Sequence, residues 1–326
     1  MRYSKQVYDA AAQELMRRKA AAQALAELHR DQVLEKCPEL SLIEEQMRGA
    51  VLSAVKLLNG GGGDAAVVKS LSKKNLAAQK ERRELLKASG FPGDYLEEKY
   101  TCRLCSDTGF VEGRMCKCHS ELLKQLACEE LSRSSPSELC TFESFSLDYY
   151  PQIVCPGTKF TQRFAMKNTL EFCKKYAAGF SRASENLHFY GATGLGKTHL
   201  SLAIAGEVAK NGFGVVYITA QNLMNKLEKE HFAKDAQEDT IELVLECDLL
   251  IIDDLGTEFA TSFTNAALYN IINTRLLTGS PVIVNSNLTV AELEEKYDQR
   301  LASRIGSFAF FEFFGTDIRQ LMQNKK

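Results

Sequence analysis

The chain has 326 residues, of which 45% are hydrophobic and 25% charged, and its formal net charge at pH 7 is −2. This length and composition suit a globular protein with two domains, and nucleic-acid binding would need a local basic patch. No apolar run approaches the roughly 18 residues of a membrane span, and the first residues do not resemble a secretory signal. We therefore expect a cytoplasmic protein that does not bind membranes and whose ten cysteines stay reduced.

Residues 1–98 predict a helical domain without strands. Apolar residues recur at helical spacing until Pro38 ends a first long helix. Ser41 and Glu44 have the spacing of a capping box for a second helix, which the glycines at 60–63 end as a flexible joint. Because the apolar stripes are thin, a plain helical bundle and a face that docks on a partner protein both remain open.

Four cysteines then follow in the spacing of a structural zinc site. Two short turns, Cys-x-x-Cys and Cys-x-Cys, stand ten residues apart, and four thiolates can surround Zn²⁺ tetrahedrally. We assign as ligands Cys102, Cys105, Cys116 and Cys118. His119 is an alternative to Cys118, because either lies within reach of the third cysteine. No position is left open for catalysis, so the metal should hold together a small module over residues 99–130.

A serine-rich stretch within residues 131–141 predicts a linker to the last domain, residues 142–326. In that domain, short apolar runs alternate with helical segments. The runs are residues 187–190, 214–219, 248–253, 281–285 and 308–314. Continuous apolar strands separated by helices predict an α/β fold, a parallel five-stranded sheet with helices on both faces.

The segment from Gly191 to Thr198 matches the phosphate-binding loop G-x-x-x-x-G-K-[ST] at every fixed position. Its glycines let backbone N–H groups surround a phosphate, its lysine reaches the β and γ phosphates, and the threonine hydroxyl ligates Mg²⁺. An apolar strand precedes the loop and a helical pattern follows it, as this motif requires. The predicted nucleotide-binding residues are Gly191, Ala192, Thr193, Gly194, Leu195, Gly196, Lys197, Thr198 and His199.

Two aspartates end the third apolar run and are predicted to complete the site. We expect Asp253 to hold Mg²⁺ through water, together with Thr198, and Asp254 to orient or deprotonate the attacking water. The same residues also satisfy D-x-x-G of GTPases. However, the nearest match to the guanine motif N-K-x-D, at residues 225–228, ends in glutamate and lies upstream. ATP is therefore the expected nucleotide.

Polar residues late in the chain are candidates for contacting the γ-phosphate. The fourth strand ends in Asn285, Ser286 and Asn287, which places polar amides beside the γ-phosphate. Two arginines lie far from the loop in sequence. Arg304, with Arg300 as the alternative, is expected to act as a finger on the nucleotide of a neighbouring subunit, and Arg319 as a γ-phosphate sensor. A small-molecule kinase is disfavoured, because too little chain follows Arg319 to form a substrate lid.

From residue 142 onward the chain resembles the ATPase domain of bacterial replicative-helicase loaders of the DnaC and DnaI type. These form a branch of the AAA+ proteins close to the IstB transposition helpers. The resemblance covers about 185 residues and rests on segments that stand where the family has Walker A, Walker B, sensor one, the arginine finger and sensor two. In order, these are residues 191–198, 251–256, 286–288, 303–305 and 317–319. The cysteine-bearing N-terminal part is closer to the DnaI type, by architecture only.

The resemblance implies a slow, Mg²⁺-dependent ATPase that oligomerisation and DNA stimulate. It would bind a hexameric replicative helicase, self-associate on it in a ring or spiral, and help place it on single-stranded DNA. Residues 1 to about 125 would bind the helicase without ATP. Residues 225–234, with lysines around Phe232, are a candidate DNA contact or simply a solvated helix. The alternative function is an IstB-like transposition helper that acts on duplex DNA with a transposase.

Overall fold

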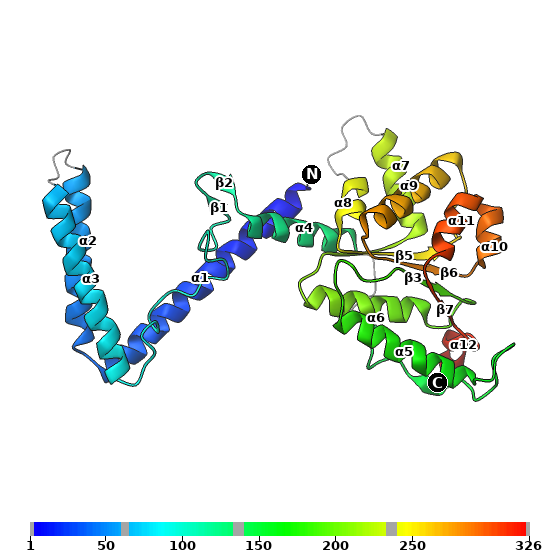
Figure 1. Cartoon of the computed structure of the whole chain (residues 1–326), viewed down its shortest axis with the longest axis horizontal. Coiled ribbons are helices and arrows are strands. Elements are labelled where there is room, and N and C mark those ends of the chain that lie inside the picture. Colours follow the sequence, from blue (N-terminus) through cyan, green and yellow to red (C-terminus); the bar gives the residue numbers. More distant parts are fainter. Residues whose placement is uncertain (1–2, 60–64, 133–139, 233–239, 324–326) are drawn as a thin grey trace. The chain divides into compact units, whose positions relative to one another are not determined.

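The structure is a computed structural model that describes residues 3–59, 65–132, 140–232 and 240–323 (Figure 1). Its contacts divide the chain into two compact units, Met1–Ala11 with Ser120–Lys326, and Ala12–His119. The division falls inside α1 (Lys5–Lys36) and α4 (Lys117–Leu131), and so differs from the predicted boundaries near residues 98, 130 and 141. Those domain boundaries stay a prediction, and most of the predicted linker lies outside the described residues.

The smaller unit is helical, as predicted. It contains most of α1 together with α2 (Leu40–Asn59) and α3 (Ala65–Ala88), which lie side by side (Figure 1). The predicted capping box is wrong, because the helix begins earlier. Ser41 lies in the first turn of α2 and donates to the carbonyl of Pro38 at 2.7 Å, while Glu44 pairs with Arg30. The glycines expected to form a joint at 60–63 lie outside the described residues.

The apolar stripe expected on the first helix is buried only in part. Ala11 and Leu15 are buried, but Met16 and Leu28 are 71% and 54% exposed. Leu42 and Leu52 of α2 are exposed as well. The helical unit thus presents several large apolar side chains on its surface. None of the described helices is long and apolar enough to span a membrane.

The larger unit is built on a parallel five-stranded sheet in the order β4-β5-β6-β3-β7. Its strands are β3 (Leu187–Tyr190), β4 (Val215–Thr219), β5 (Leu249–Leu255), β6 (Val282–Ser286) and β7 (Ala309–Glu312). The predicted fold class is therefore confirmed. The phosphate-loop strand β3 lies next to β6, which separates it from the aspartate-bearing strand β5.

Helices cover both faces of the sheet (Figure 1). On one face lie α5 (Gln162–Ala178) and α6 (Lys197–Lys210). On the other lie α7 (Ala220–Phe232), α8 (Thr240–Glu246) and α9 (Ser262–Thr278). The helices α10 (Val290–Lys296) and α11 (Gln299–Gly306) precede β7, and α12 (Ile318–Gln323) follows it. This double cover explains why the central strands are continuous apolar runs.

A buried arginine connects the ends of several elements around β5. Arg275 of α9 is fully buried, and its guanidinium donates to the carbonyls of Val244 and Pro281, both at 2.8 Å, and Cys247 at 3.0 Å. These carbonyls stand at the end of α8 and just before β5 and β6. A helix end leaves such carbonyls without partners in its own turn. One side chain thus satisfies them and fixes where β5 and β6 begin.

The strand β4 forms one edge of the described sheet, and the residues at the end of α4 cover part of it. The hydroxyl of Ser132 accepts the backbone N–H of Tyr217 at 3.0 Å. Ser4 in turn donates to Glu130 of α4 at 2.8 Å. The first residues of the chain and the end of α4 therefore belong structurally to the larger unit.

Candidate functional site

The loop that joins β3 to α6 has a backbone that requires glycine. Gly191 and Gly194 adopt positive φ angles of 144° and 77°. A Cβ atom at Gly191 would lie 2.6 Å from the carbonyl oxygen of Phe313, and one at Gly194 would lie 2.0 Å from Oδ1 of Asp317. Both the dihedrals and the space exclude other residues. The loop therefore packs against the segment after β7, which carries Arg319.

Lys197, the first residue of α6, is almost fully buried and points its ammonium group at three oxygens. Its Nζ donates to the carbonyls of Gly191 at 2.6 Å and Ala192 at 2.8 Å and to Oδ1 of Asn287 at 2.6 Å. Burial lowers the pKa of Lys197 to about 8, although the charges of Asp254 and Asp253 act against this shift. The protonation of the Lys197 ammonium group therefore depends on its burial and on the charges of these aspartates.

Asp253 lies at the centre of a buried hydrogen-bond network. Its Oδ2 accepts from the hydroxyl of Thr198 at 2.9 Å and from the hydroxyl of Tyr217, and its Oδ1 accepts from Nδ2 of Asn285 at 2.6 Å. A hydroxyl beside a carboxylate is the kind of oxygen donor pair that Mg²⁺ prefers, so these residues fit the expected ion. Thr198 and Asp253 would hold it.

Asp254 follows at the open side of the network and lines the cavity. It is half-buried and has a positive φ of 53°, a conformation that non-glycine residues adopt rarely. Burial, and next the neighbouring charge of Asp253, raise the pKa of Asp254. A carboxylate with a raised pKa accepts a proton more readily, which suits the predicted role of orienting or deprotonating water.

Of the two amides expected beside the γ-phosphate, only Asn287 belongs to the described lining of the cavity. Asn287 contacts Lys197 and donates to Thr193 at 3.3 Å. The interpretation that placed Asn285 beside the γ-phosphate as well is wrong. That side chain is fully buried, bonds to Asp253, and lies 2.8 Å from the Ser201 hydroxyl. The difference arises because Asn285 lies inside β6, whereas Asn287 follows the last residue of the strand.

The phosphate loop, Asp254, Asn287 and Arg319 line one cavity of about 290 Å³. Its other walls are largely apolar and aromatic. They are formed by Cys140, Phe145, Tyr149, Tyr150, Ile318 and Met322, with Ser144 and Ser146. An apolar and aromatic wall next to a phosphate loop suits a nucleotide base. The cavity thus joins a polar end to an aromatic end.

The aromatic wall is tied to the phosphate loop by two side chains. The hydroxyl of Tyr150 donates to the carbonyl of Leu195 at 2.9 Å, and the Tyr150 ring stacks on Phe145. Nε2 of His199 lies 2.8 Å from the carbonyl of Thr141 and 3.1 Å from the hydroxyl of Ser144. Sequence reasoning missed this wall. The density of aromatic residues in 142–150, just before the fold begins, is the signal that could have revealed it.

The predicted arginines lie in two places. Arg319 lines the cavity, and its backbone N–H donates to Asp317 at 2.9 Å. Arg304 of α11 is exposed, lies outside the described lining of the cavity, and donates to Asn273 at 3.0 Å. Arg300 pairs with Asp298 at 3.1 Å and lies over the ring of Tyr269. Neither arginine of α11 reaches the cavity of its own chain.

The four predicted zinc ligands converge in the smaller unit, and their sulfur atoms all lie within 4.8 Å of one another. The Cys102 and Cys116 sulfurs are 3.8 Å apart, and those of Cys105 and Cys118 are 3.4 Å apart. Tetrahedral zinc with bonds of about 2.3 Å would place sulfurs about 3.8 Å apart. A backbone N–H bond from Cys105 lowers the pKa of Cys102 to about 7. The donor set therefore fits Zn²⁺.

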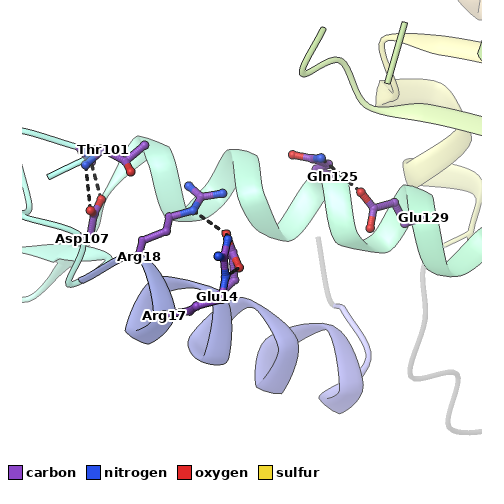
Figure 2. Close-up of polar contacts among 8 residues, drawn as sticks. Glu14, Arg17, Arg18, Thr101, Asp107, Gln125 and Glu129 are labelled. Carbon is purple, nitrogen blue, oxygen red and sulfur yellow. Dashed lines mark hydrogen bonds and ion pairs between the residues drawn. The ribbon is translucent and has the colours of Figure 1, made fainter. Parts of the chain in front are cut away.

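The backbone turns around the cysteines bring the two cysteine pairs together. Both carboxylate oxygens of Asp107 accept backbone N–H groups, from Thr101 and from Cys102, each at 2.8 Å (Figure 2). The short hairpin of β1 (Phe110–Val111) and β2 (Arg114–Met115) then returns the chain to the second pair. His119 stands outside the cysteine cluster of the described residues, and its ring packs edge-on against Phe110. This geometry favours Cys118 as the fourth ligand.

Comparison with known proteins agrees with the nucleotide site. Residues 162–305 match the family model described as IstB-like ATP binding protein. The chain is 26% identical over 244 residues to the phage-like element PBSX protein XkdC of Bacillus subtilis, covering 69% of this chain and 84% of that protein. It is 24% identical over 168 residues to the replicative helicase loader DnaC of Escherichia coli, covering 51% of this chain and 62% of DnaC, just under two thirds.

A solved structure, AMPPCP-bound DnaA from Aquifex aeolicus, is also similar, with a TM-score of 0.45 and 24% identity over 57% of this chain and 54% of that one. The matched segment thus resembles a family of ATP-binding proteins, and the similar proteins include a helicase loader and a protein of a phage-like element.

ATP affinity should fall as the pH rises above about 8, where Lys197 loses its proton. Below that pH the lysine is charged and pairs with the phosphates. Above it, affinity should decline by up to about tenfold per pH unit, because binding then requires protonation. The measurement is a titration with a fluorescent ATP analogue between about pH 7 and pH 9.5. The arginine of Lys197→Arg stays charged over this whole range. Any ATP affinity that this variant retains should therefore not change with pH. Equal wild-type affinity at both ends of the range contradicts this account.

Purified full-length protein should contain one zinc ion per chain, and Cys118→Ser should lose it because a ligand is missing. His119→Gln should retain the metal and serves as the matched control. Elemental analysis, with circular dichroism to monitor helix content, gives both results. A folded, zinc-free wild-type protein, or equal zinc loss in the two variants, would rule out the four-cysteine site.

Proposed function

We propose that the chain is a cytoplasmic, ATP-dependent loader that binds the replicative DNA helicase and helps place it on single-stranded DNA. The observation that carries this proposal is the cavity in which the phosphate loop, Asp254, Asn287 and Arg319 meet. A site of this kind can couple nucleotide binding to a change of conformation. The similarity to the replicative helicase loader DnaC over 168 residues supports the choice of partner.

In this function the cavity binds and slowly hydrolyses ATP. The glycine loop and Lys197 hold the phosphates, and Asn287 keeps the ammonium group aimed at them. Bound Mg²⁺ would neutralise phosphate charge. Asp253 and Thr198 provide its oxygen ligands. Asp254 orients the attacking water and takes its proton, a role that its raised pKa supports.

The catalytic arginine comes from a second copy of the chain. Arg304 is exposed on α11 and lies outside the described lining of its own cavity. An arginine supplied in trans is worth on the order of 10³-fold or more in phosphoryl-transfer rate. Hydrolysis should therefore be slow in a single chain and faster when several copies line up on the helicase in a ring or spiral.

Single-stranded DNA is proposed to contact α7. Phe232 at its end is 80% exposed, and Lys226 and Lys229 precede it on the same helix. Lysines can follow a phosphate backbone while an exposed ring stacks on a base. Lys234, at the end of the predicted segment, lies outside the described residues.

The helical unit is proposed to hold the helicase. Its exposed leucines and Met16 give it apolar surface that a partner can bury. Because this unit is linked to the ATP-binding unit, binding through one raises the effective concentration of the other at the helicase. ATP between neighbours would then favour an open ring that admits DNA.

A transposition helper acting on duplex DNA is the second candidate function. It is favoured by one observation, the match of residues 162–305 to the IstB-like family model. The two functions share the nucleotide site and differ in partner. A helper would bind a transposase and duplex DNA, whereas a loader would bind a hexameric helicase and single strands.

Full-length protein should co-elute with the replicative helicase of its host on size-exclusion chromatography, with or without ATP. The helicase should also raise its rate of ATP hydrolysis, because several copies then share nucleotide sites. Arg304→Ala should still co-elute but lose this stimulation, since the finger is missing. No complex with the helicase, combined with binding to a transposase and duplex DNA, would favour the transposition helper instead.

A further inference from the structure

We propose that Tyr217 is a positioning residue that fixes the Asp253 carboxylate for Mg²⁺, so that the edge strand β4 sets the magnesium dependence of nucleotide binding. The inference rests on the ATP site proposed above and adds a residue that none of the nucleotide motifs contains. Tyr217 lies in β4, at the far side of β5 from the phosphate loop.

Tyr217 reaches the metal-binding pair directly. Its hydroxyl donates to Oδ2 of Asp253, and the same oxygen accepts from the Thr198 hydroxyl at 2.9 Å. In the parallel register Tyr217 stands opposite Ile251, two residues before Asp253. Residues two apart on a strand share a face, so the sheet aims the tyrosine ring along the side where the aspartate projects.

Together with the other hydrogen-bond donors, the Tyr217 hydroxyl holds the Asp253 carboxylate in one orientation. Nδ2 of Asn285 donates to the opposite oxygen at 2.6 Å, and that amide is held in turn by Ser201, at 2.8 Å. The donors come from β4, α6 and β6, so the carboxylate is held from three elements. Rotation of Asp253 would break bonds on both oxygens at once. A buried carboxylate that loses a donor pays much of its desolvation penalty.

Tyr217 can act only as a donor here. Its side chain is 6% exposed. A phenol has a single O–H, and the hydrogen bond to Oδ2 of Asp253 uses it. Tyr217 therefore stabilises the carboxylate without competing for the ion as a charged ligand. Phenylalanine would fill the same space but supply no bond.

The position of Tyr217 depends on contacts outside the nucleotide motifs. On the open edge of the sheet its backbone N–H donates to the hydroxyl of Ser132 at 3.0 Å, and Ser132 in turn donates to the carbonyl of Cys128 at 2.8 Å. Backbone N–H groups of an edge strand otherwise lack a partner strand. The end of α4 is thus connected to Asp253 through Tyr217, whose backbone bonds to Ser132 and whose hydroxyl bonds to the aspartate.

The test compares Tyr217→Phe with Tyr176→Phe in the full chain. Tyr176 is also buried and donates to a carbonyl, that of Glu185 at 3.0 Å, but it lies in α5 and outside the described lining of the cavity. ATP affinity is measured in EDTA and across a Mg²⁺ titration. Tyr217→Phe should raise the Mg²⁺ concentration for half-maximal tight binding about tenfold, the loss expected for a bond to a charged group. Its affinity in EDTA should be unchanged, and Tyr176→Phe should alter neither value.

Ser132→Ala gives a second variant that retains the tyrosine hydroxyl and should shift the Mg²⁺ midpoint less, in the same direction. A wild-type midpoint in Tyr217→Phe, or an equal loss of affinity in EDTA and in Mg²⁺, overturns the inference. If Tyr217→Phe does not fold, an unshifted midpoint in Ser132→Ala overturns it. A wild-type chain that binds no ATP overturns the proposed function and this inference together. Magnesium-dependent wild-type binding with an unaffected Tyr217→Phe overturns the inference alone.

Discussion

A carboxylate that is withdrawn from water must be given hydrogen-bond donors, and the nucleotide-binding unit is arranged to supply them to Asp253. Thr198 of α6, Tyr217 of β4 and Asn285 of β6 all donate to it. These elements are separated by up to 87 residues of sequence (285 minus 198) and meet only because the strand order places β4 and β6 on either side of β5. The hydrogen-bond network around Asp253 therefore depends on the strand order of the sheet.

The cavity follows from this arrangement. The phosphate loop leaves the central strand β3, so its lysine and threonine face the ends of β5 and β6. The segments before and after the sheet close the other side with Tyr150 and Arg319. Arg304 points elsewhere and bonds to Asn273. If a second copy of the chain completes the γ-phosphate side of the site, the rate of ATP hydrolysis would depend on assembly of several copies. The proposed loader requires such a dependence.

Much of this was predictable from sequence, and the reason is periodicity. Continuous apolar runs predicted the five strands, fixed spacing predicted the phosphate loop, and paired cysteines predicted the cysteine cluster. The aromatic wall and Tyr217 were not predicted, because their roles arise from contacts across the sheet rather than from local pattern. The Ser41 capping box failed because the hydroxyl instead donates to Pro38. Asn285 was misplaced because it lies inside β6 and bonds to Asp253, whereas Asn287 follows the strand.

The most direct test separates the two neighbouring aspartates by their isosteric amides. Asp253→Asn removes the charge that the three donors hold, whereas Asp254→Asn removes only the group that faces the cavity. ATP affinity with and without Mg²⁺ and the rate of ATP hydrolysis are measured for both full-length variants. The account predicts that Asp253→Asn loses the magnesium-dependent part of binding, and that Asp254→Asn keeps it but hydrolyses ATP poorly. Identical behaviour of the two variants would contradict the account.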